Sequence, residues 1–208
     1  ENISFETCKG ECIALIGPNG SGKTTLLKII SGLILPDQGY VLDHKNQPLK
    51  HSKITMVNSN DRSFFWRLSV NENLQFFCAK PFEESRKRIS ETLDLLNLSS
   101  KSNTMFMKLS YGERKKVAIA RALLSNAKIL LLDEITNSLD ISAKTLLIQT
   151  IKTLLVKGNI ELIIFATHSL DEVLSLSNRF IYIENKNLAK DQSVTARTLL
   201  SDVESLFT

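Results

Sequence analysis

The chemistry of this chain is concentrated first in the glycine-rich stretch GPNGSGKT, residues 17–24. It matches the pattern G-x-x-x-x-G-K-[S/T], in which backbone N–H groups of a loop surround a phosphate group. An apolar run precedes the loop and a helical pattern follows it, which is the context that this pattern requires. Lys23 is expected to add positive charge beside the outer phosphates, and the Thr24 hydroxyl is suited to holding Mg²⁺. The predicted phosphate-binding residues are Gly17, Pro18, Asn19, Gly20, Ser21, Gly22, Lys23, Thr24 and Thr25.

Two acidic residues, Asp133 and Glu134, follow the apolar run ILLL. Ligands of open α/β sheets bind at the carboxyl ends of the strands, so both carboxylates should lie beside the phosphate loop. Asp133 is suited to Mg²⁺, and Glu134 to polarising a water molecule for attack on the terminal phosphate. The alternative is an acidic turn with a structural role only, and the phosphate loop in the same chain favours catalysis.

A second candidate anion site lies in the stretch KLSYGERKKVAIARALL, residues 108–124. We interpret it as a turn around Gly112 followed by a basic, amphipathic helix. The amino end of a helix attracts anions, because its free N–H groups and its dipole point outward. The chain would therefore carry two phosphate sites, only one of them with its own lysine.

Composition limits the remaining possibilities. The chain has 208 residues, 43% of them hydrophobic, which is enough for one well-packed core. Its net charge is +4, but the basic residues are scattered and no aromatic stacking motif accompanies them, so we expect no nucleic-acid partner. The three cysteines show no disulfide or metal spacing and are interpreted as free thiols. No apolar run reaches the roughly 18 residues of a membrane span.

Strand and helix patterns alternate along the chain, which favours an α/β fold with a mostly parallel central sheet. Continuous apolar runs such as ILLL are typical of parallel strands that are buried on both faces. Between residues 60 and 126 the pattern is helical only, and we predict an inserted helical subdomain there. The predicted strands cover residues 11–17, 39–43, 53–57, 128–134, 160–168 and 179–185; the predicted helices cover 23–33, 69–77, 83–97, 113–124, 141–158, 170–177 and 193–207.

Five segments, GPNGSGKTT, LSYGE, ILLLDE, NSLD and ATH, occur in this order. Together they resemble the nucleotide-binding subunit of an ATP-binding cassette (ABC) transporter, over essentially the whole chain. The resemblance implies one P-loop NTPase domain over residues 1–208, with an antiparallel β portion besides the parallel sheet. It also implies a switch role for His168, which would donate a hydrogen bond to the γ-phosphate. The segments matching the signature (usually LSGGQ) and the D-loop contribute Leu109, Ser110, Tyr111, Gly112 and Glu113, and Ser138, Leu139 and Asp140.

The resemblance also explains the second anion site. Two such subunits bind head to tail, most simply as a homodimer, and each ATP with its Mg²⁺ lies between Lys23 of one subunit and Ser110 and Gly112 of the other. The signature needs no lysine because it completes the partner's site. Family members work with integral membrane subunits, which here would be separate chains. The expected location is peripheral, on the cytoplasmic face of the cell (inner) membrane.

This sequence departs from the family pattern at several positions. The family has a glutamine after the strand at 53–57, where Ser59 is nearest here and becomes the candidate Mg²⁺ contact. Tyr111 replaces a signature glycine, and its backbone can still serve if its φ stays negative. Ile135 replaces a proline, a change that we expect to be tolerated. The upstream aromatic residue that stacks on adenine is absent, and since the chain begins without Met, we expect residues to precede it.

Lys23, Glu134 and His168, the predicted catalytic residues, are all present, so we predict an active ATPase. The stretch RSFFWRLSVNENLQFF, residues 62–77, is similar to that of ATPases of exporters of polysaccharides, lipids or drugs. There the aromatic residues at 64–66 would dock a membrane subunit, although burial in the core is the alternative. The competing function is a soluble ABC ATPase of iron–sulfur assembly or DNA repair. Repair types separate the loop from the signature by long coiled coils, and no heptads appear here.

Overall fold

The central element of the computed structural model, which describes residues 3–58, 63–78 and 82–194, is one twisted β-sheet. Its strand order is β2-β3-β4-β1-β5-β6, and only β6 runs antiparallel, against β5. This confirms the mostly parallel α/β fold and its antiparallel portion. The strands are β1 (Cys12–Ile16), β2 (Ile54–Asn58), β3 (Ile129–Asp133), β4 (Leu162–Ala166), β5 (Arg179–Glu184) and β6 (Asn187–Ser193).

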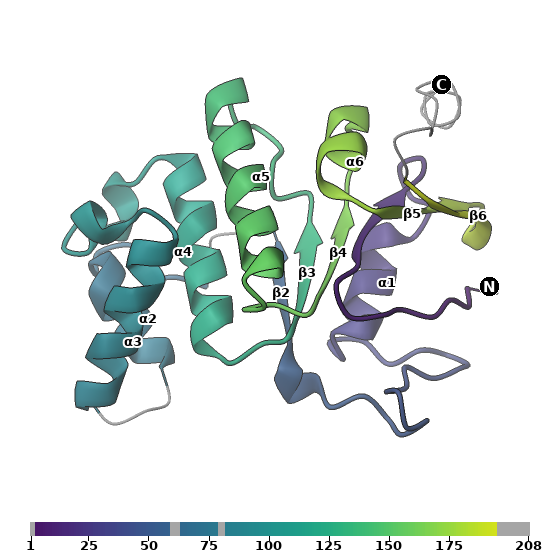
Figure 1. Ribbon diagram of the computed structural model, residues 1–208, viewed down its shortest axis with the longest axis horizontal. Helices are drawn as coiled ribbons and strands as arrows, with labels where there is room; N and C mark the ends of the chain where they lie inside the picture. The colour runs from purple at the N-terminus through teal and green to yellow at the C-terminus, as the bar shows by residue number, and fades with distance from the viewer. Residues whose placement is uncertain (1–2, 59–62, 79–81, 195–208) are drawn as a thin grey trace.

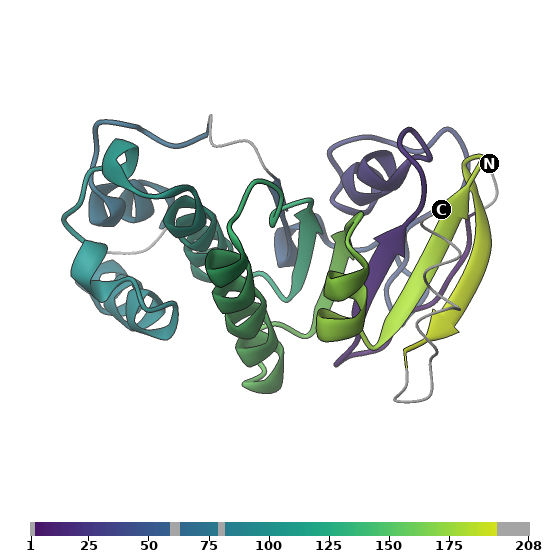
Figure 2. The same cartoon turned by 90° about the horizontal axis from the view of Figure 1, so that it is seen from above.

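Helices cover both faces of this sheet. Figures 1 and 2 show α1 on one face and α5 and α6 on the other, while α2, α3 and α4 form a lobe beyond β2. In the part of the chain that the structure describes, no helix is long and apolar enough to cross a membrane. The helices are α1 (Lys23–Ile30), α2 (Val70–Phe77), α3 (Phe82–Leu95), α4 (Tyr111–Leu124), α5 (Ile141–Val156) and α6 (Leu170–Leu176).

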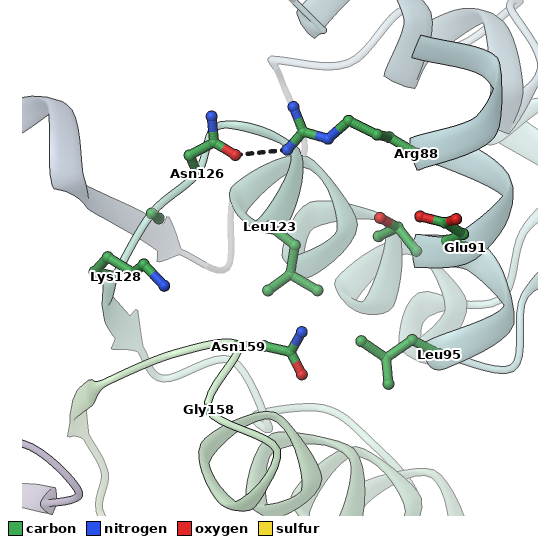
Figure 3. A pocket seen from close by; sticks show the side chains of 10 residues that line it. Arg88, Glu91, Leu95, Leu123, Asn126, Lys128, Gly158 and Asn159 are labelled. Carbon is green, nitrogen blue, oxygen red and sulfur yellow. Dashed lines mark hydrogen bonds between the residues drawn. The ribbon is translucent and has the colours of Figure 1, made fainter. Parts of the chain in front are cut away.

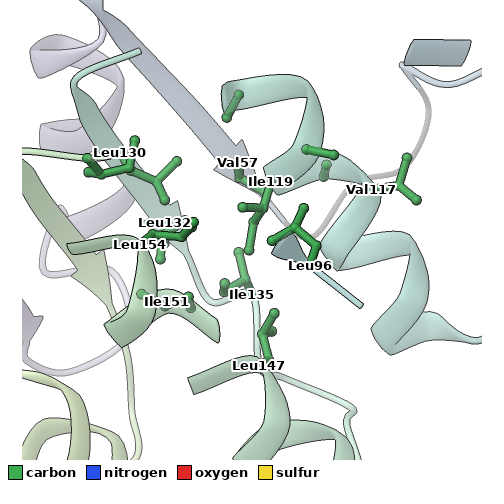
Figure 4. Packing of buried hydrophobic residues seen from close by; sticks show 14 of the residues in the cluster. Val57, Leu96, Val117, Ile119, Leu130, Leu132, Ile135, Leu147, Ile151 and Leu154 are labelled. Carbon is green, nitrogen blue, oxygen red and sulfur yellow. The ribbon is translucent and has the colours of Figure 1, made fainter. Parts of the chain in front are cut away.

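Strands β1, β3 and β4 owe their continuous apolar sequences to burial on both faces. In β3, Leu131 packs in the layer under α1 with Leu27, whereas Leu130 and Leu132 belong to the larger layer on the other face. That larger layer contains Ile151 of α5 and reaches the helical lobe through α4 (Figure 4). Each strand is thereby fixed in place, and the loops at its carboxyl end start from a rigid base.

Two serines start helices of the lobe by the same device. The Ser69 hydroxyl accepts a hydrogen bond from the Glu72 N–H at 3.2 Å, and the Glu72 carboxylate accepts one from the Ser69 N–H at 2.7 Å. Ser110 and Glu113 repeat this reciprocal pair at the start of α4, at 3.2 Å and 2.8 Å. Such a capping box satisfies N–H groups that the first helical turn leaves unpaired. The described residues between 63 and 126 form helices and no named strand, which confirms a helical insertion.

Two predictions about regular structure need correction or lie partly outside the described residues, and one observed strand was not predicted. Residues 39–43 form no strand of the sheet; Leu42 makes an isolated bridge to Pro48 within a local hairpin. Strand β6 was not predicted, because its sequence NLAKDQS is polar and half exposed at the sheet edge. Of the helix predicted over 193–207, Ser193 instead ends β6, and residues 195–207 lie outside the described part.

The aromatic cluster at 64–66 is divided between core and surface. Phe64 is buried, at 5% exposure, and stacks on Phe106 with 4.5 Å between ring centroids. Phe65 and Trp66 are each 44% exposed. The prediction that all three residues form a surface is therefore wrong for Phe64, which fills the space beside Phe106 in the lobe.

Candidate functional site

The phosphate loop connects β1 to α1 and takes its shape from glycines with positive φ. Gly17 has φ of +147°, and a Cβ atom there would lie 2.1 Å from the carbonyl oxygen of Ile183 on β5. No other residue type fits at Gly17. Gly20 and Gly22 have φ of +80° and +105°, a conformation that glycine adopts without strain. The loop therefore passes close to the sheet and delivers the chain directly into the first turn of α1.

Lys23 is the buried cation of this loop, at 6% exposure. Its ammonium donates hydrogen bonds to the carbonyl oxygens of Gly17 at 2.8 Å and Pro18 at 3.0 Å. Burial lowers the pKa of Lys23, while the nearby carboxylates of Glu134 and Asp133 oppose this shift. An ammonium has three donors, so one N–H remains to bind a phosphate oxygen.

Ser21 adds a second polar group to the loop. Its hydroxyl is buried and has no hydrogen-bond partner within the described residues. A buried hydroxyl without a partner is costly, since it has lost its hydration. A phosphate oxygen bound in the loop would supply that partner, so the loop fits the ligand that its sequence predicts.

Thr24 and Asp133 join the start of α1 to the end of β3. The Thr24 hydroxyl donates to Asp133 Oδ1 at 2.9 Å. Burial raises the pKa of Asp133, and the hydrogen bond from Thr24 acts in the opposite direction. Hydroxyl and carboxylate oxygens are the donors that Mg²⁺ prefers, so this pair fits the predicted metal site. Ser59 lies outside the described residues; Asn58, just before it, is paired in register with Asp133.

Glu134 and His168 meet because their strands, β3 and β4, are neighbours. Oε1 of Glu134 lies 2.7 Å from Nε2 of His168, and both side chains are about one-third exposed. Asn137 donates from its amide nitrogen to the other carboxylate oxygen at 2.8 Å. Asn137 was not singled out from the sequence, although an amide three residues after the acid, in the same turn, is within reach. Glu134 has a left-handed φ of 51°, which turns the chain away from the strand.

The signature residues form the first turn of α4. The turn predicted around Gly112 is absent: α4 begins at Tyr111, Ser110 is its N-cap, and Gly112 has no positive φ. The capping box makes a glycine turn unnecessary. A Cβ atom on Gly112 would lie 3.4 Å from that of Ala143, so the glycine allows close packing against α5. Tyr111 also has no positive φ, so its backbone can take the place of the family's glycine. The centre of its ring lies 4.2 Å from the Lys115 ammonium.

The D-loop segment lies directly before α5. Ser138 has a φ of 66°, and the Asp140 carboxylate caps α5 by accepting a hydrogen bond from the Ala143 N–H at 2.8 Å. Leu139 is the other close neighbour of Gly112, at 3.6 Å from the position of a Cβ atom there. The structure thus brings five predicted residues together at the carboxyl ends of the strands: Lys23, Thr24, Asp133, Glu134 and His168. It also places the signature against the D-loop.

A profile of the family described as "ABC transporter" matches residues 1–137. The chain belongs to the ABC transporter family. It is an ATP-binding domain of that family, with the P-loop NTPase fold of its ATP-hydrolysing domains. The matched residues include the phosphate loop, the helical lobe, Asp133 and Glu134.

Curated relatives of this ABC domain include proteins named for import and for export. The spermidine/putrescine import ATP-binding protein PotA of Legionella pneumophila is 37% identical over 195 residues, which is 90% of this chain and 53% of PotA. This chain thus spans about half of PotA. The SkfA peptide export ATP-binding protein SkfE of Bacillus subtilis is 32% identical, over 92% of this chain and 81% of SkfE.

Solved structures of ABC proteins share the fold. CbiO1 of Clostridium perfringens, part of the ABC transporter complex cbiONQ, superimposes with a TM-score of 0.85 at 25% identity, over 99% of this chain and 83% of that one. A dimeric ATP-binding cassette in a post-hydrolysis state, bound to ADP and Pi, gives a TM-score of 0.79 at 28% identity, over 94% and 90%.

Two hollows in the described part of this ABC domain lie at opposite ends of the strands of the sheet. One, of about 330 Å³, is lined by the phosphate loop and by Asn185 and Lys186 of the β5–β6 turn. The other, of about 350 Å³, contains Asn159 and Arg88, whose guanidinium donates to the Asn126 side chain at 2.6 Å (Figure 3). It lies beside the amino ends of β3 and β4, whereas ligands of such sheets bind at the carboxyl ends. The hollow beside the phosphate loop is therefore the one at the ligand-binding ends of the strands.

Proposed function

We propose that this chain is the ATP-binding and ATP-hydrolysing subunit of an ABC transporter, acting as a single ATPase domain over residues 1–208. The observation that carries the proposal is the 2.7 Å contact between Glu134 and His168. This contact lies at the carboxyl ends of the strands, together with the Thr24–Asp133 hydrogen bond and the buried Lys23 ammonium. A potential base, a hydrogen-bond donor and a phosphate loop at one edge are the parts that ATP hydrolysis requires.

In this proposal the tasks are divided among the side chains of the site. Lys23 and the N–H groups of the loop bind the β- and γ-phosphates, and Thr24 and Asp133 would hold Mg²⁺. When bound, the ion neutralises charge on the phosphates. Glu134 accepts the proton of the attacking water, and His168 orients Glu134 and donates a hydrogen bond to the γ-phosphate. Asn137, which holds the second oxygen of Glu134, keeps the carboxylate from rotating.

We further propose that two copies bind head to tail, so that the start of α4 meets the ATP of the partner. Ser110 at the helix start and the helix N–H groups beside it would face that γ-phosphate. The helical start of α4 supports this, because Tyr111 and Gly112 present helix N–H groups. The dimeric cassette bound to ADP and Pi supports a dimer by similarity.

Transport is supported by the names of the relatives, which favour it over the iron–sulfur assembly or repair alternative. We propose membrane-spanning partners on separate chains and a peripheral position on the cytoplasmic face of the cell membrane. Both import and export occur among the relatives, so they support no direction. Our proposal of export rests on the resemblance of residues 62–77 to exporter ATPases. In that stretch the rings of Phe65 and Trp66 are exposed, and the sequence ENL follows at residues 72–74.

Replacing Lys23 with methionine tests the nucleotide site. We expect ATP affinity to fall about thirtyfold, because a charge-assisted hydrogen bond to phosphate contributes roughly 2 kcal/mol. Calorimetric titration with ATP measures the change. Lys157→Met removes the same charge from an exposed position after α5 and should bind ATP like the parent. If Lys23→Met binds ATP as tightly as Lys157→Met, the phosphate loop does not have the proposed role.

Replacing Trp66 with alanine tests the docking surface. The ATPase should co-purify with a membrane protein of about six spans encoded beside it, and Trp66→Ala should reduce recovery about tenfold, since aromatic anchors dominate interfaces. Tyr40→Ala removes an even more exposed ring from another surface and should leave recovery unchanged. Equal recovery of both variants would contradict docking at Trp66, and a neighbouring gene for repair or assembly would contradict transport.

A further inference from the structure

A buried carboxylate on α6 connects the two loops that carry the proposed catalytic pair. Glu172 is 4% exposed, although it lies in the first turn of a surface helix. Its Oε1 accepts a hydrogen bond from the Thr136 hydroxyl at 2.6 Å, and its Oε2 accepts one from the Thr167 hydroxyl at 2.7 Å. The ammonium of Lys144 on α5 forms an ion pair with Oε1 at 2.8 Å.

The partners of Glu172 are adjacent in sequence to the catalytic pair. Thr136 follows Glu134 by two residues, and Thr167 directly precedes His168. Lys144 also donates to the Ser169 hydroxyl at 2.8 Å, on the other side of His168. One carboxylate therefore holds the loop after β3 and the loop after β4 at a fixed separation.

Attaching α6 to the sheet does not require this charge. Val173 and Leu176 of the same helix are buried in the larger apolar layer and supply its packing. A buried carboxylate loses its hydration, and its pairing with cations and hydroxyls often only offsets that cost. An apolar side chain at 172 would pack the helix at lower cost, but it would hold neither Thr136 nor Thr167.

We propose that Glu172 is a positioning residue, which sets the contact between Glu134 and His168 by holding Thr136 and Thr167. The proposal rests on the proposed function of that pair. Displacement of a reacting group by about 1 Å can reduce turnover about a hundredfold. Glu172 touches neither member of the pair in the contacts described, so it acts through the two threonines.

The threonines allow a test that preserves shape. Thr136→Val and Thr167→Val each remove one hydroxyl, and each should lower kcat about tenfold with KM for ATP changed less than about twofold. The double variant should lose little more than either single variant, because both act on one contact. Glu172→Gln, which keeps the shape but has one acceptor oxygen, should show the same separation of kcat from KM. Asp171→Asn removes a neighbouring but exposed charge from α6 and should match the parent.

A second measurement separates this proposal from the ATPase proposal. The imidazole NMR signal of His168, assigned with His168→Gln, should shift in Thr136→Val and Thr167→Val but not in Asp171→Asn, in nucleotide-free protein. If the parent hydrolyses no ATP, the proposed ATPase function is wrong. The NMR signal would still report whether Glu172 positions His168. An unchanged signal, or folded variants with parental kcat, would overturn the positioning role.

Discussion

Glu134→Gln is expected to lower kcat for ATP hydrolysis by about a thousandfold, the scale of losing a general base. The amide has the shape of the carboxylate but cannot take a proton from water. ATP affinity should change little, because Lys23 and the loop N–H groups remain. Steady-state hydrolysis at saturating ATP measures the change.

The same variant should trap the closed dimer. If ATP bridges two subunits and hydrolysis removes the bridge, a chain that binds ATP without cleaving it accumulates as a dimer. Analytical ultracentrifugation with and without ATP detects this state. Glu83→Gln makes the same chemical change at an exposed position in α3 and should hydrolyse ATP and remain as monomeric as the parent. Parental turnover in Glu134→Gln would remove Glu134 from the mechanism.

The sequence predicted the central parts of this site because each is encoded locally. The phosphate loop requires glycines, as the close approach of Gly17 to Ile183 illustrates, and they recur at fixed spacing. Asp133 and Glu134 end a continuous apolar run, so their place at the strand end follows from burial of the strand on both faces. The pairing of β3 with β4 then brings Glu134 near His168.

What escaped prediction depends on contacts between distant residues. Glu172 is an ordinary acid on a helix until the fold brings it to Thr136, which is 36 residues away in the chain. Phe64 has the sequence neighbours of a surface aromatic residue, yet it stacks on Phe106 from another segment. Strand β6 is polar along its length and becomes a strand by pairing with β5, since an edge position demands no apolar pattern.

The start of α4 supports a second large effect. Ser110→Ala is expected to lower kcat about a hundredfold, the scale of losing one donor to a developing charge, while ATP affinity stays nearly unchanged. Affinity is retained because Ser110 would contact the ATP of the partner, whose own loop supplies most of the binding. Paired measurements of kcat and of ATP affinity test this separation, and an equal loss of both would contradict the contact across subunits.

Ser110 also caps α4, and the loss of a cap costs about 1 kcal/mol of stability. Ser69→Ala provides the matched control, because Ser69 caps α2 through the same reciprocal pair with Glu72. Both variants should lose similar stability in thermal unfolding, and only Ser110→Ala should lose turnover. If Ser69→Ala were equally inactive, the effect of Ser110→Ala would be that of a lost cap.

Mixing two defective chains decides whether the site is shared. A dimer of Lys23→Met with Ser110→Ala contains one site with an intact Lys23 and an intact Ser110, each from a different chain, and one site that lacks both. Since random pairing makes about half of the dimers mixed, up to about a quarter of parental activity should return. If each subunit used its own Ser110, every site in the mixture would remain defective and no activity would return. Recovery on mixing therefore requires that the start of α4 completes the site of the other chain.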